Sequence, residues 1–104
     1  MDNKKKEQQF SQLKGELRIT WDVEATNTEL NNIINNAEGY LNHLLGAEID
    51  YTASGIENML FMAYCGYVWN DCESEFEDAY MRDILRCRAM YEVKTYEDEN
   101  SGTE

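Results

Sequence analysis

Apolar residues in this chain recur at the three- and four-residue spacing of an α-helix, and this spacing is what most limits the fold. Between residues 30 and 45 they form one stripe of Leu30, Ile33, Ile34, Ala37, Tyr40, Leu41, Leu44 and Leu45. Polar residues, mostly asparagines, occupy the opposite face, as in a helix with one buried side. Thr26 and Glu29 have the spacing of a capping box at its start, and Gly46 suits a left-handed residue at its end.

A second segment, 56–69, is apolar on nearly every side. Its apolar members are Ile56, Met59, Leu60, Phe61, Met62, Ala63, Tyr64, Cys65, Tyr67, Val68 and Trp69. This pattern predicts a central helix, with Ser54 and Glu57 as a capping box. Because so short a chain buries only about two-thirds of its unfolded surface, we expect a partner subunit to cover part of this helix.

A third helical segment follows Asn70 and Asp71, which interrupt the apolar pattern. Ser74 and Glu77 repeat the capping-box spacing. The apolar side of the predicted helix consists of Phe76, Ala79, Tyr80, Ile84, Leu85, Cys87 and Tyr91. Its basic residues are Arg82, Arg86 and Arg88. They lie in its middle and later part, where cations suit the negative end of the helix dipole.

Both ends of the chain are polar. Residues 1–9, with the run Lys4 to Lys6, predict a flexible, solvated N-terminal arm. A short first helix of about two turns then follows. Its apolar residues are Phe10, Leu13 and Leu17. Beyond Val93 the helical period is lost, so residues 94–104 predict a mobile acidic C-terminal tail and leave an ordered core over about 10–93.

These segments together predict one all-α domain over residues 1–104, a small bundle of three to four helices. The absence of proline agrees, because helix interiors exclude it. The chain has 21 acidic and 9 basic residues, a net charge of −12, so it should repel DNA over most of its surface. The acidity either keeps the chain soluble, mimics DNA, or forms a wall past which DNA slides.

No pattern in the sequence indicates catalysis, a cofactor or a metal. The only histidine, His43, has no nucleophile in local register with it. Cys65, Cys72 and Cys87 are odd in number and lack CxxC spacing, so we expect free, metal-free thiols. The six glycines are scattered rather than gathered in a phosphate-binding loop. We therefore predict that the protein is not an enzyme and has no catalytic, cofactor-binding or metal-binding residues.

The N-terminal stretch also lacks the apolar core of a signal peptide, and no apolar run approaches the length of a membrane span. We therefore expect a protein that is made and kept in a reducing cytoplasm and does not contact a membrane.

The candidate interface residues are Arg82, Arg86, Arg88, Tyr91, Tyr96, Trp69 and Trp21. Two uses of the arginines stay open. They either pair with Asp78 and Asp83 on their own helix, or dock onto acidic groups of a neighbouring subunit. The aromatic residues serve either the core alone or the core and an interface together.

Three stretches of the chain follow a pattern known from one protein family. They are the run Leu13 to Ile19 ahead of an acidic loop, the stretch Tyr40 to Gly46 followed by Ile49-Asp50-Tyr51, and the C-terminal series Asn70, Phe76 to Tyr80, Asp83 to Leu85 and Tyr91 to Val93. Together they resemble the head–tail connector (adaptor) proteins of tailed bacteriophages. The resemblance covers about residues 10–93.

This resemblance implies a structural virion protein whose copies form a homo-oligomeric ring. The ring would bridge the phage portal protein and the stopper or tail-completion protein, with a channel through which DNA passes without sequence-specific binding. The protein would be made in the host cytoplasm and reside in the head–tail connector region of the virion. Connector proteins often reach a neighbouring ring with their C-terminal region, so we expect the segment Arg82 to Tyr96 to make that contact.

A second function stays open, that of a small acidic regulatory protein which binds a host or phage protein, for example as a DNA mimic. An enzyme or metal protein is a third alternative. Ring assembly predicts a large oligomer or one that depends on the portal, whereas a regulator predicts a monomer or dimer that competes with DNA. An enzyme predicts a closed pocket around His43 or the cysteines.

Overall fold

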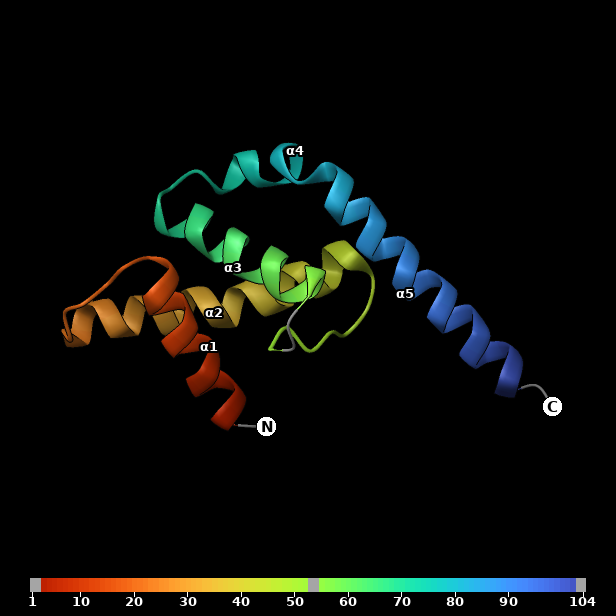
Figure 1. Ribbon diagram of the computed structural model, residues 1–104, viewed down its shortest axis with the longest axis horizontal. Coiled ribbons are helices and arrows are strands. Elements are labelled where there is room, and N and C mark those ends of the chain that lie inside the picture. Colours follow the sequence, from red (N-terminus) through yellow and green to blue (C-terminus); the bar gives the residue numbers. More distant parts are fainter. Residues whose placement is uncertain (1–2, 53–54, 103–104) are drawn as a thin grey trace.

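The computed structural model of this protein describes residues 3–52 and 55–102, with side chains described for 4–52 and 55–92. The elements in chain order are α1 (Asn3–Glu16), α2 (Glu24–Leu45), α3 (Ile56–Trp69), the short 3-10 helix η1 (Glu73–Glu75), α4 (Phe76–Ala79) and α5 (Met81–Gly102) (Figure 1). No strand occurs over these ranges, so the predicted all-α class is confirmed. The described residues form five α-helices, however, where three to four were predicted.

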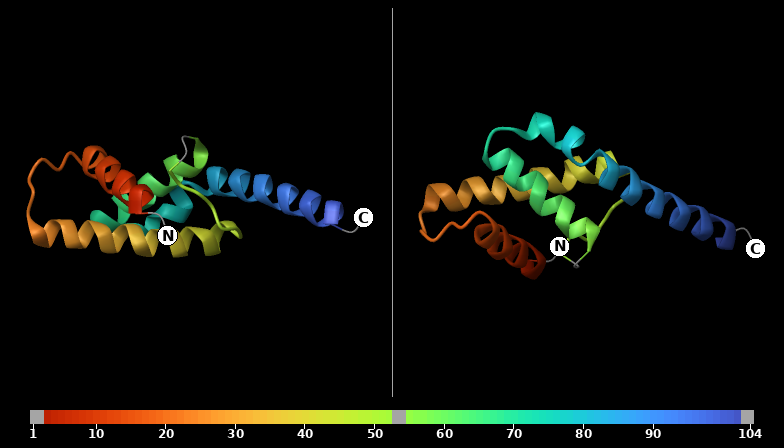
Figure 2. Two further views of the ribbon diagram at one scale, coloured as in Figure 1. Left: turned by 90° about the horizontal axis from the view of Figure 1, so that it is seen from below. Right: turned by 45° about the horizontal axis from the view of Figure 1, so that its top comes forward.

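Helix α2 turns its apolar stripe toward the core, as the spacing predicts. The buried residues are Leu30, Ile33, Ile34, Ala37, Leu41 and Leu45. Gly46 ends the helix with a φ of 74°, and its N–H donates to the carbonyl of Asn42. The left-handed stop is therefore confirmed. Helix α3 lies across α2, so the two helices bury each other's apolar sides (Figure 2).

Helix α3 is the centre of the core, as predicted. Its buried residues are Leu60, Phe61, Met62 and Cys65. The remaining large apolar residues of α3 are half-buried against the same core, apart from the exposed Met59. The cover comes from α1, α2, α4 and α5 of the same chain. Helix α3 therefore needs less cover from a partner than its composition suggests.

Of the N-terminal arm predicted over residues 1–9, the structure describes residues 3–9, and these are helical. Helix α1 begins at Asn3 and is about four turns long. Gln9 and Leu13 on its inner side are buried, and Lys5 one turn earlier forms an ion pair with Asp50, at 2.9 Å between Nζ and Oδ2. Polar side chains hold this part of α1 to the body, and apolar spacing could not reveal them.

The first predicted capping box does not start its helix. Helix α2 begins at Glu24, directly after Val23, and no side chain caps it. Thr26 instead lies inside the helix, where its hydroxyl accepts a hydrogen bond from Nε1 of Trp21 at 3.1 Å. The Thr26 hydroxyl therefore bonds to the preceding loop and not to a backbone N–H of the first turn, as the capping box would require.

The third capping box is not formed as predicted, and the second includes a residue outside the described part of the chain. Helix α3 starts after Gly55 without a side-chain cap, and Ser54 lies outside the described residues. Ser74 lies within η1, and no side chain caps η1 or α4. The carboxylate of Glu77 accepts a hydrogen bond from the Tyr40 hydroxyl at 2.5 Å. The Glu77 side chain therefore makes a tertiary contact instead of the capping hydrogen bond.

The predicted fourth helix is divided in two. Helix α3 ends immediately before residues 70–71, as predicted, but Tyr80 adopts φ −116° and ψ 20° and separates α4 from α5. Phe76 of α4 is fully buried, and its ring makes edge contacts with the rings of Tyr64 and Tyr67, with centroids 5.2 and 5.9 Å away. This aromatic packing fixes α4 against α3 and sets the direction in which α5 leaves.

Helix α5 continues to Gly102, so the prediction that helical structure ends near Val93 is wrong. Thr103 and Glu104 lie outside the described residues. The first half of α5 packs against α2 and α3, and the second half extends away from the helical body (Figures 1 and 2). The molecule is correspondingly elongated, with dimensions of 54 × 31 × 19 Å.

Candidate functional site

The first half of α5 has two unlike faces. Ile84 and Cys87 are buried against the body, whereas Met81 and Leu85 are exposed, Leu85 to 55%. Met90, five residues after Leu85, is also exposed. Leu85 was predicted on the apolar inner side beside Ile84, and this assignment is wrong. Successive residues of a helix point about 100° apart, so the side that buries Ile84 turns Leu85 outward.

Two arginines lie beside these apolar residues. Arg82 and Arg86 are exposed, one turn apart, and each follows an apolar residue of the exposed face. We call Met81, Arg82, Leu85 and Arg86 the α5 patch. A shallow depression at its start is lined by Asp78, Ala79, Met81, Arg82, Asp83 and Leu85. Within the described part of the chain, no ion pair joins the arginines of the patch to the acidic residues of this depression.

The remaining candidate interface residues of the C-terminal half differ in their exposure. Arg88 is exposed on α5, whereas Trp69 is half-buried at the end of α3. Tyr91 is partly buried, and its hydroxyl donates to Oε2 of Glu57 on α3 at 2.8 Å. The side chain of Tyr96 lies outside the described part. The arginines of α5 are therefore exposed, whereas Tyr91 forms a hydrogen bond within its own protomer.

Trp21 lies in the loop between α1 and α2 and is 47% exposed. Its Nε1 donates to the Thr26 hydroxyl at 3.1 Å, which fixes the edge of the indole and leaves much of the ring in solvent. Val23 is half exposed beside it. Asp22 and Glu24, also exposed, add two negative charges. We call Trp21, Asp22, Val23 and Glu24 the loop patch.

Basic charge is confined to two parts of the sequence. No lysine or arginine occurs between Arg18 and Arg82, while acidic residues are spread through this interval. The arginines of α5 therefore form the one basic cluster in the sequence between Arg18 and Lys94. In a chain of net charge −12, such a cluster is attracted to acidic surfaces, including those of other copies.

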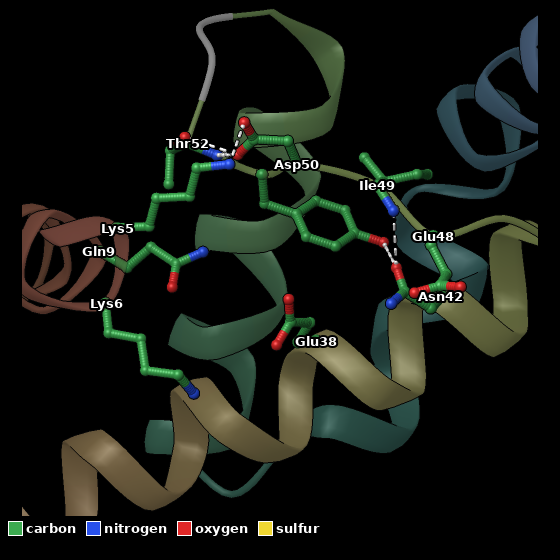
Figure 3. A pocket seen from close by; sticks show the side chains of 10 residues that line it. Lys5, Lys6, Gln9, Glu38, Asn42, Glu48, Ile49, Asp50 and Thr52 are labelled. Atoms are coloured by element: carbon green, nitrogen blue, oxygen red, sulfur yellow. Dashed lines mark hydrogen bonds and ion pairs between the residues drawn. The ribbon is translucent and has the colours of Figure 1, made fainter. Parts of the chain in front are cut away.

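A pocket opens between α1, α2 and the segment that follows α2 (Figure 3). It is lined by Lys5, Lys6, Gln9, Glu38, Asn42, Glu48, Ile49, Asp50, Tyr51 and Thr52. Oδ1 of Asp50 accepts hydrogen bonds from the Thr52 N–H and hydroxyl, at 3.0 and 2.6 Å. These bonds, together with Lys5, lower the pKa of Asp50 to about 2. The carboxylate is therefore charged at neutral pH and unsuited to donate a proton.

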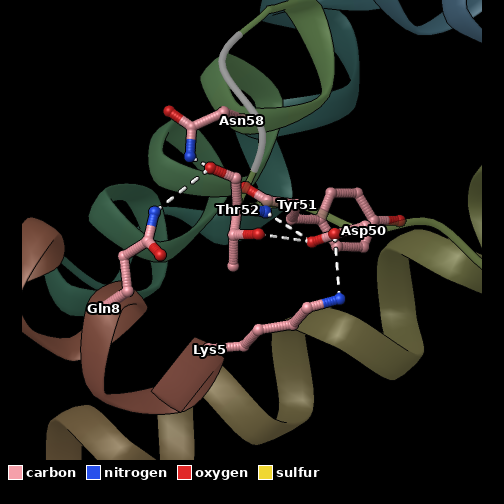
Figure 4. Close-up of polar contacts among 6 residues, drawn as sticks. All are labelled: Lys5, Gln8, Asp50, Tyr51, Thr52 and Asn58. Atoms are coloured by element: carbon pink, nitrogen blue, oxygen red, sulfur yellow. Dashed lines mark hydrogen bonds and ion pairs between the residues drawn. The ribbon is translucent and has the colours of Figure 1, made fainter. Parts of the chain in front are cut away.

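Helix α1 holds the segment 50–52 in place, as Figure 4 shows. Beside the Lys5–Asp50 ion pair, Nε2 of Gln8 donates to the carbonyl of Thr52 at 3.3 Å. On the other side, Nδ2 of Asn58 donates to the carbonyl of Tyr51 at 2.8 Å. Lys5 and Gln8 of α1 thus serve the fold, because they fasten the connection between α2 and α3.

Tyr51 carries the buried polar group of the same segment. Its side chain is 1% exposed, and its hydroxyl donates to Oδ1 of Asn42 at 2.9 Å. The N–H of Ile49 donates to the same oxygen at 3.2 Å. Burial raises the pKa of Tyr51, so the phenol stays protonated at neutral pH. This residue is part of the core and not an acid or a base.

Two of the three cysteines, Cys65 and Cys87, are buried. Burial raises the pKa of the Cys65 thiol to about 12, and burial also raises the pKa of Cys87. A reactive cysteine needs the opposite shift. All three cysteines are free, and His43 is exposed on α2. Over the described residues, no group of three or more His, Cys, Asp or Glu side chains is placed to hold a metal ion.

Comparisons with protein-family models, with curated proteins and with solved structures give no match to this chain. Among the helices of the described ranges, none combines the length and apolar character needed to cross a bilayer. Over the described residues, the two exposed patches contain four of the six large apolar side chains that are exposed.

Proposed function

We propose that this chain is a structural protein and not an enzyme, and that it is a head–tail connector (adaptor) of a tailed bacteriophage. Copies form a ring between the portal protein and the stopper or tail-completion protein, with a channel through which DNA passes. The observation that carries the proposal is the α5 patch. It combines exposed apolar side chains with arginines, and both kinds of residue are enriched where proteins dock.

The position of this patch supports a role in assembly. It lies in the first half of α5, which packs against the helical body, and the second half of the helix extends beyond that body (Figure 1). The projecting half of this 22-residue helix is roughly 16 Å long, which extends the protomer toward a neighbouring ring. This reach fits the expectation that the segment Arg82 to Tyr96 makes that contact.

Two of the stretches that carry the family resemblance contact each other, which also supports the proposal. Tyr40, at the start of one resembling stretch, stacks on Tyr64 with ring centroids 4.4 Å apart. Its hydroxyl donates to Glu77, within another such stretch. The resembling stretches on α2 and α4 are therefore in direct contact with each other.

The distribution of acidic charge suits a channel protein. Four exposed acidic residues follow one another closely through η1 and α4, namely Glu73, Glu75, Glu77 and Asp78. Such a surface repels the phosphate backbone and lets DNA slide without holding it. On this proposal the protein is made in the host cytoplasm and resides in the virion, in the head–tail connector region.

The test is the mass of the protein, measured by native mass spectrometry alone and after mixing with a purified portal ring. We expect a ring-sized oligomer, either alone or once the portal ring is present. A protein that remains a monomer or dimer in both samples is not a connector. If that small species also displaces DNA from a basic protein, the function is that of an acidic regulator instead.

A further inference from the structure

We infer that neighbouring copies of this chain join head to tail, with the loop patch of one copy seated on the α5 patch of the next. The inference rests on the self-assembly proposed above and specifies the contact that produces it. The two patches share one plan, since each has two exposed apolar side chains beside two exposed charged ones. The apolar pairs would cover each other, and the acidic pair would face the arginines.

The exposed apolar surface of the protein is concentrated at these two places. Over the described residues, the large apolar side chains that are exposed are Trp21, Val23, Met59, Met81, Leu85 and Met90. All except Met59 belong to α5 or to the loop between α1 and α2. When the two patches meet, Trp21, Val23, Met81 and Leu85 leave water together, and the hydrophobic effect favours that association.

The charges of the two patches are opposite. Asp22 and Glu24 give the loop patch two negative charges, and Arg82 and Arg86 give the α5 patch two positive ones. Arginine binds a carboxylate through two parallel N–H groups, so such pairs fix orientation as well as adding affinity. This complementarity selects a second copy of the chain as the occupant of each patch.

The placement of the patches explains why the contact joins different copies. The loop between α1 and α2 lies at one end of the helical body, and α5 leaves from the other end (Figures 1 and 2). One chain therefore cannot close its own patches, but it can offer one to each of two neighbours. Contacts of this heterologous kind generate a ring when the rotation between copies closes. A symmetric pairing of two α5 patches would bring arginines against arginines.

The loop patch is already held in one arrangement before any contact forms. The Trp21 indole is fixed by Thr26, and Nδ2 of Asn27 donates to Oδ1 of Asp22 at 2.7 Å. An aromatic anchor that is ordered in the free protein loses less conformational entropy on binding. The loop patch is therefore prepared to act as the inserted side of the contact.

Charge reversal tests the pairing. In the full chain, Asp22→Lys with Glu24→Lys, or Arg82→Glu with Arg86→Glu, brings like charges together across the contact. Each pair of changes should lower the association constant at least about tenfold in sedimentation velocity at low salt. The variant with all four reversals keeps the net charge at −12 and should regain self-association. It should not assemble with the wild-type chain.

The matched control is Glu73→Lys with Glu75→Lys, which reverses two exposed charges outside both patches. It should leave self-association intact, and circular dichroism should show that every variant keeps its helices. The pairing of the patches is wrong if the wild type assembles and the patch reversals do not weaken assembly. It is also wrong if the variant with four reversals stays dissociated.

The proposed function and this inference can fail separately. If the four reversals restore self-association but no assembled species binds a portal ring, the contact is correct and the connector function is wrong. If the wild type assembles with a portal ring and the charge reversals do not weaken self-association, the function stands and the ring closes through other surfaces. If the wild type never assembles, alone or with a portal ring, both are wrong.

Discussion

The hydroxyl of Tyr91 on α5 donates a hydrogen bond to the carboxylate of Glu57 on α3, at 2.8 Å. Burial and this bond raise the pKa of Tyr91 to about 12. Tyr91 was a candidate interface residue from the sequence. In the structure it joins two helices of one protomer. The first half of α5 is anchored on its inner side, which holds its exposed outer side in a fixed position.

The Tyr91–Glu57 bond leads to a prediction for stability. Tyr91→Phe should lower the free energy of unfolding by about 1–2 kcal/mol, because a carboxylate loses its donor while the ring stays in place. Urea denaturation measures the change. Tyr80→Phe is the matched control, since its hydroxyl makes no hydrogen bond within the described residues. That variant should differ from the wild type by less than about 0.5 kcal/mol. Equal losses in both variants would contradict the assigned role.

A second prediction concerns the oxygen of Asn42 that serves two donors. Asn42→Leu should destabilise the protein by about 1–3 kcal/mol, because the buried Tyr51 hydroxyl loses its acceptor. Asn42→Asp keeps an acceptor at the same position and should cost less. Adding Tyr51→Phe to Asn42→Leu should recover part of the loss, since the stranded hydroxyl is removed. The assignment is wrong if Asn42→Asp and Asn42→Leu prove equally unstable.

The third prediction is a pH dependence at Asp50. Its pKa is lowered from 3.8 to about 2, first by the hydrogen bonds from Thr52 and then by Lys5. The folded state therefore favours the ionised form, which contributes stability above the unfolded-state pKa and loses it as the pH falls through the folded-state pKa. At pH 7, Asp50→Asn should be less stable than the wild type by less than about 1 kcal/mol, because the pair is half exposed.

This difference between wild type and Asp50→Asn should shrink as the pH falls from 3.8 towards 2, and thermal unfolding at several pH values measures it. A difference that stays constant over that range would show that the charge on Asp50 does not contribute.

The sequence revealed the helices that bury an apolar stripe and missed those held by polar contacts. The spacing of Leu30 to Leu45 predicted α2, including its end at Gly46, because one face of that helix is buried along its length. The first turns of α1 escaped prediction because Lys5 and Gln9 face the body, and neither is apolar. The ion pair of Lys5 joins it to a residue 45 positions away, which no local pattern indicates.

The candidate site was predicted only in part, for a related reason. The arginines of α5 were recognisable because basic residues are so rare in this chain. The exposure of Leu85 could not be recognised in this way. An apolar residue next to the buried Ile84 can lie either within the buried stripe or just outside it. Which side it takes depends on how α5 is rotated, and the break at Tyr80 between α4 and α5 sets that rotation.

The contrast between Leu60 and Leu85 gives the fourth prediction. Leu60 is fully buried in α3, so Leu60→Ala should cost about 2–5 kcal/mol in chemical denaturation, and Phe61→Ala should cost a similar amount. Leu85→Ala should change the stability of the monomer by less than about 0.5 kcal/mol. It should nevertheless weaken self-association, because it removes apolar surface from the α5 patch. A large loss of monomer stability at Leu85 would mean that its exposed position is wrong.

The last prediction separates self-assembly from contact with a neighbouring ring. Truncation after Val93 removes the end of α5 and leaves every buried residue of the described core in place. The shortened protein should keep its helical circular dichroism signal and its melting temperature.

Because the α5 patch lies before Val93, the truncated protein should also self-associate like the full chain. It should fail to join heads to tails in an assembly assay, since the projecting part of α5 is gone. The matched control is Tyr96→Ala in the full chain, which keeps the helix and tests whether that aromatic residue provides the anchor. If the truncated protein joins heads and tails at the normal rate, the contact with the neighbouring ring lies on the body of the protein, at the loop around Trp21 or at Lys4 to Lys6.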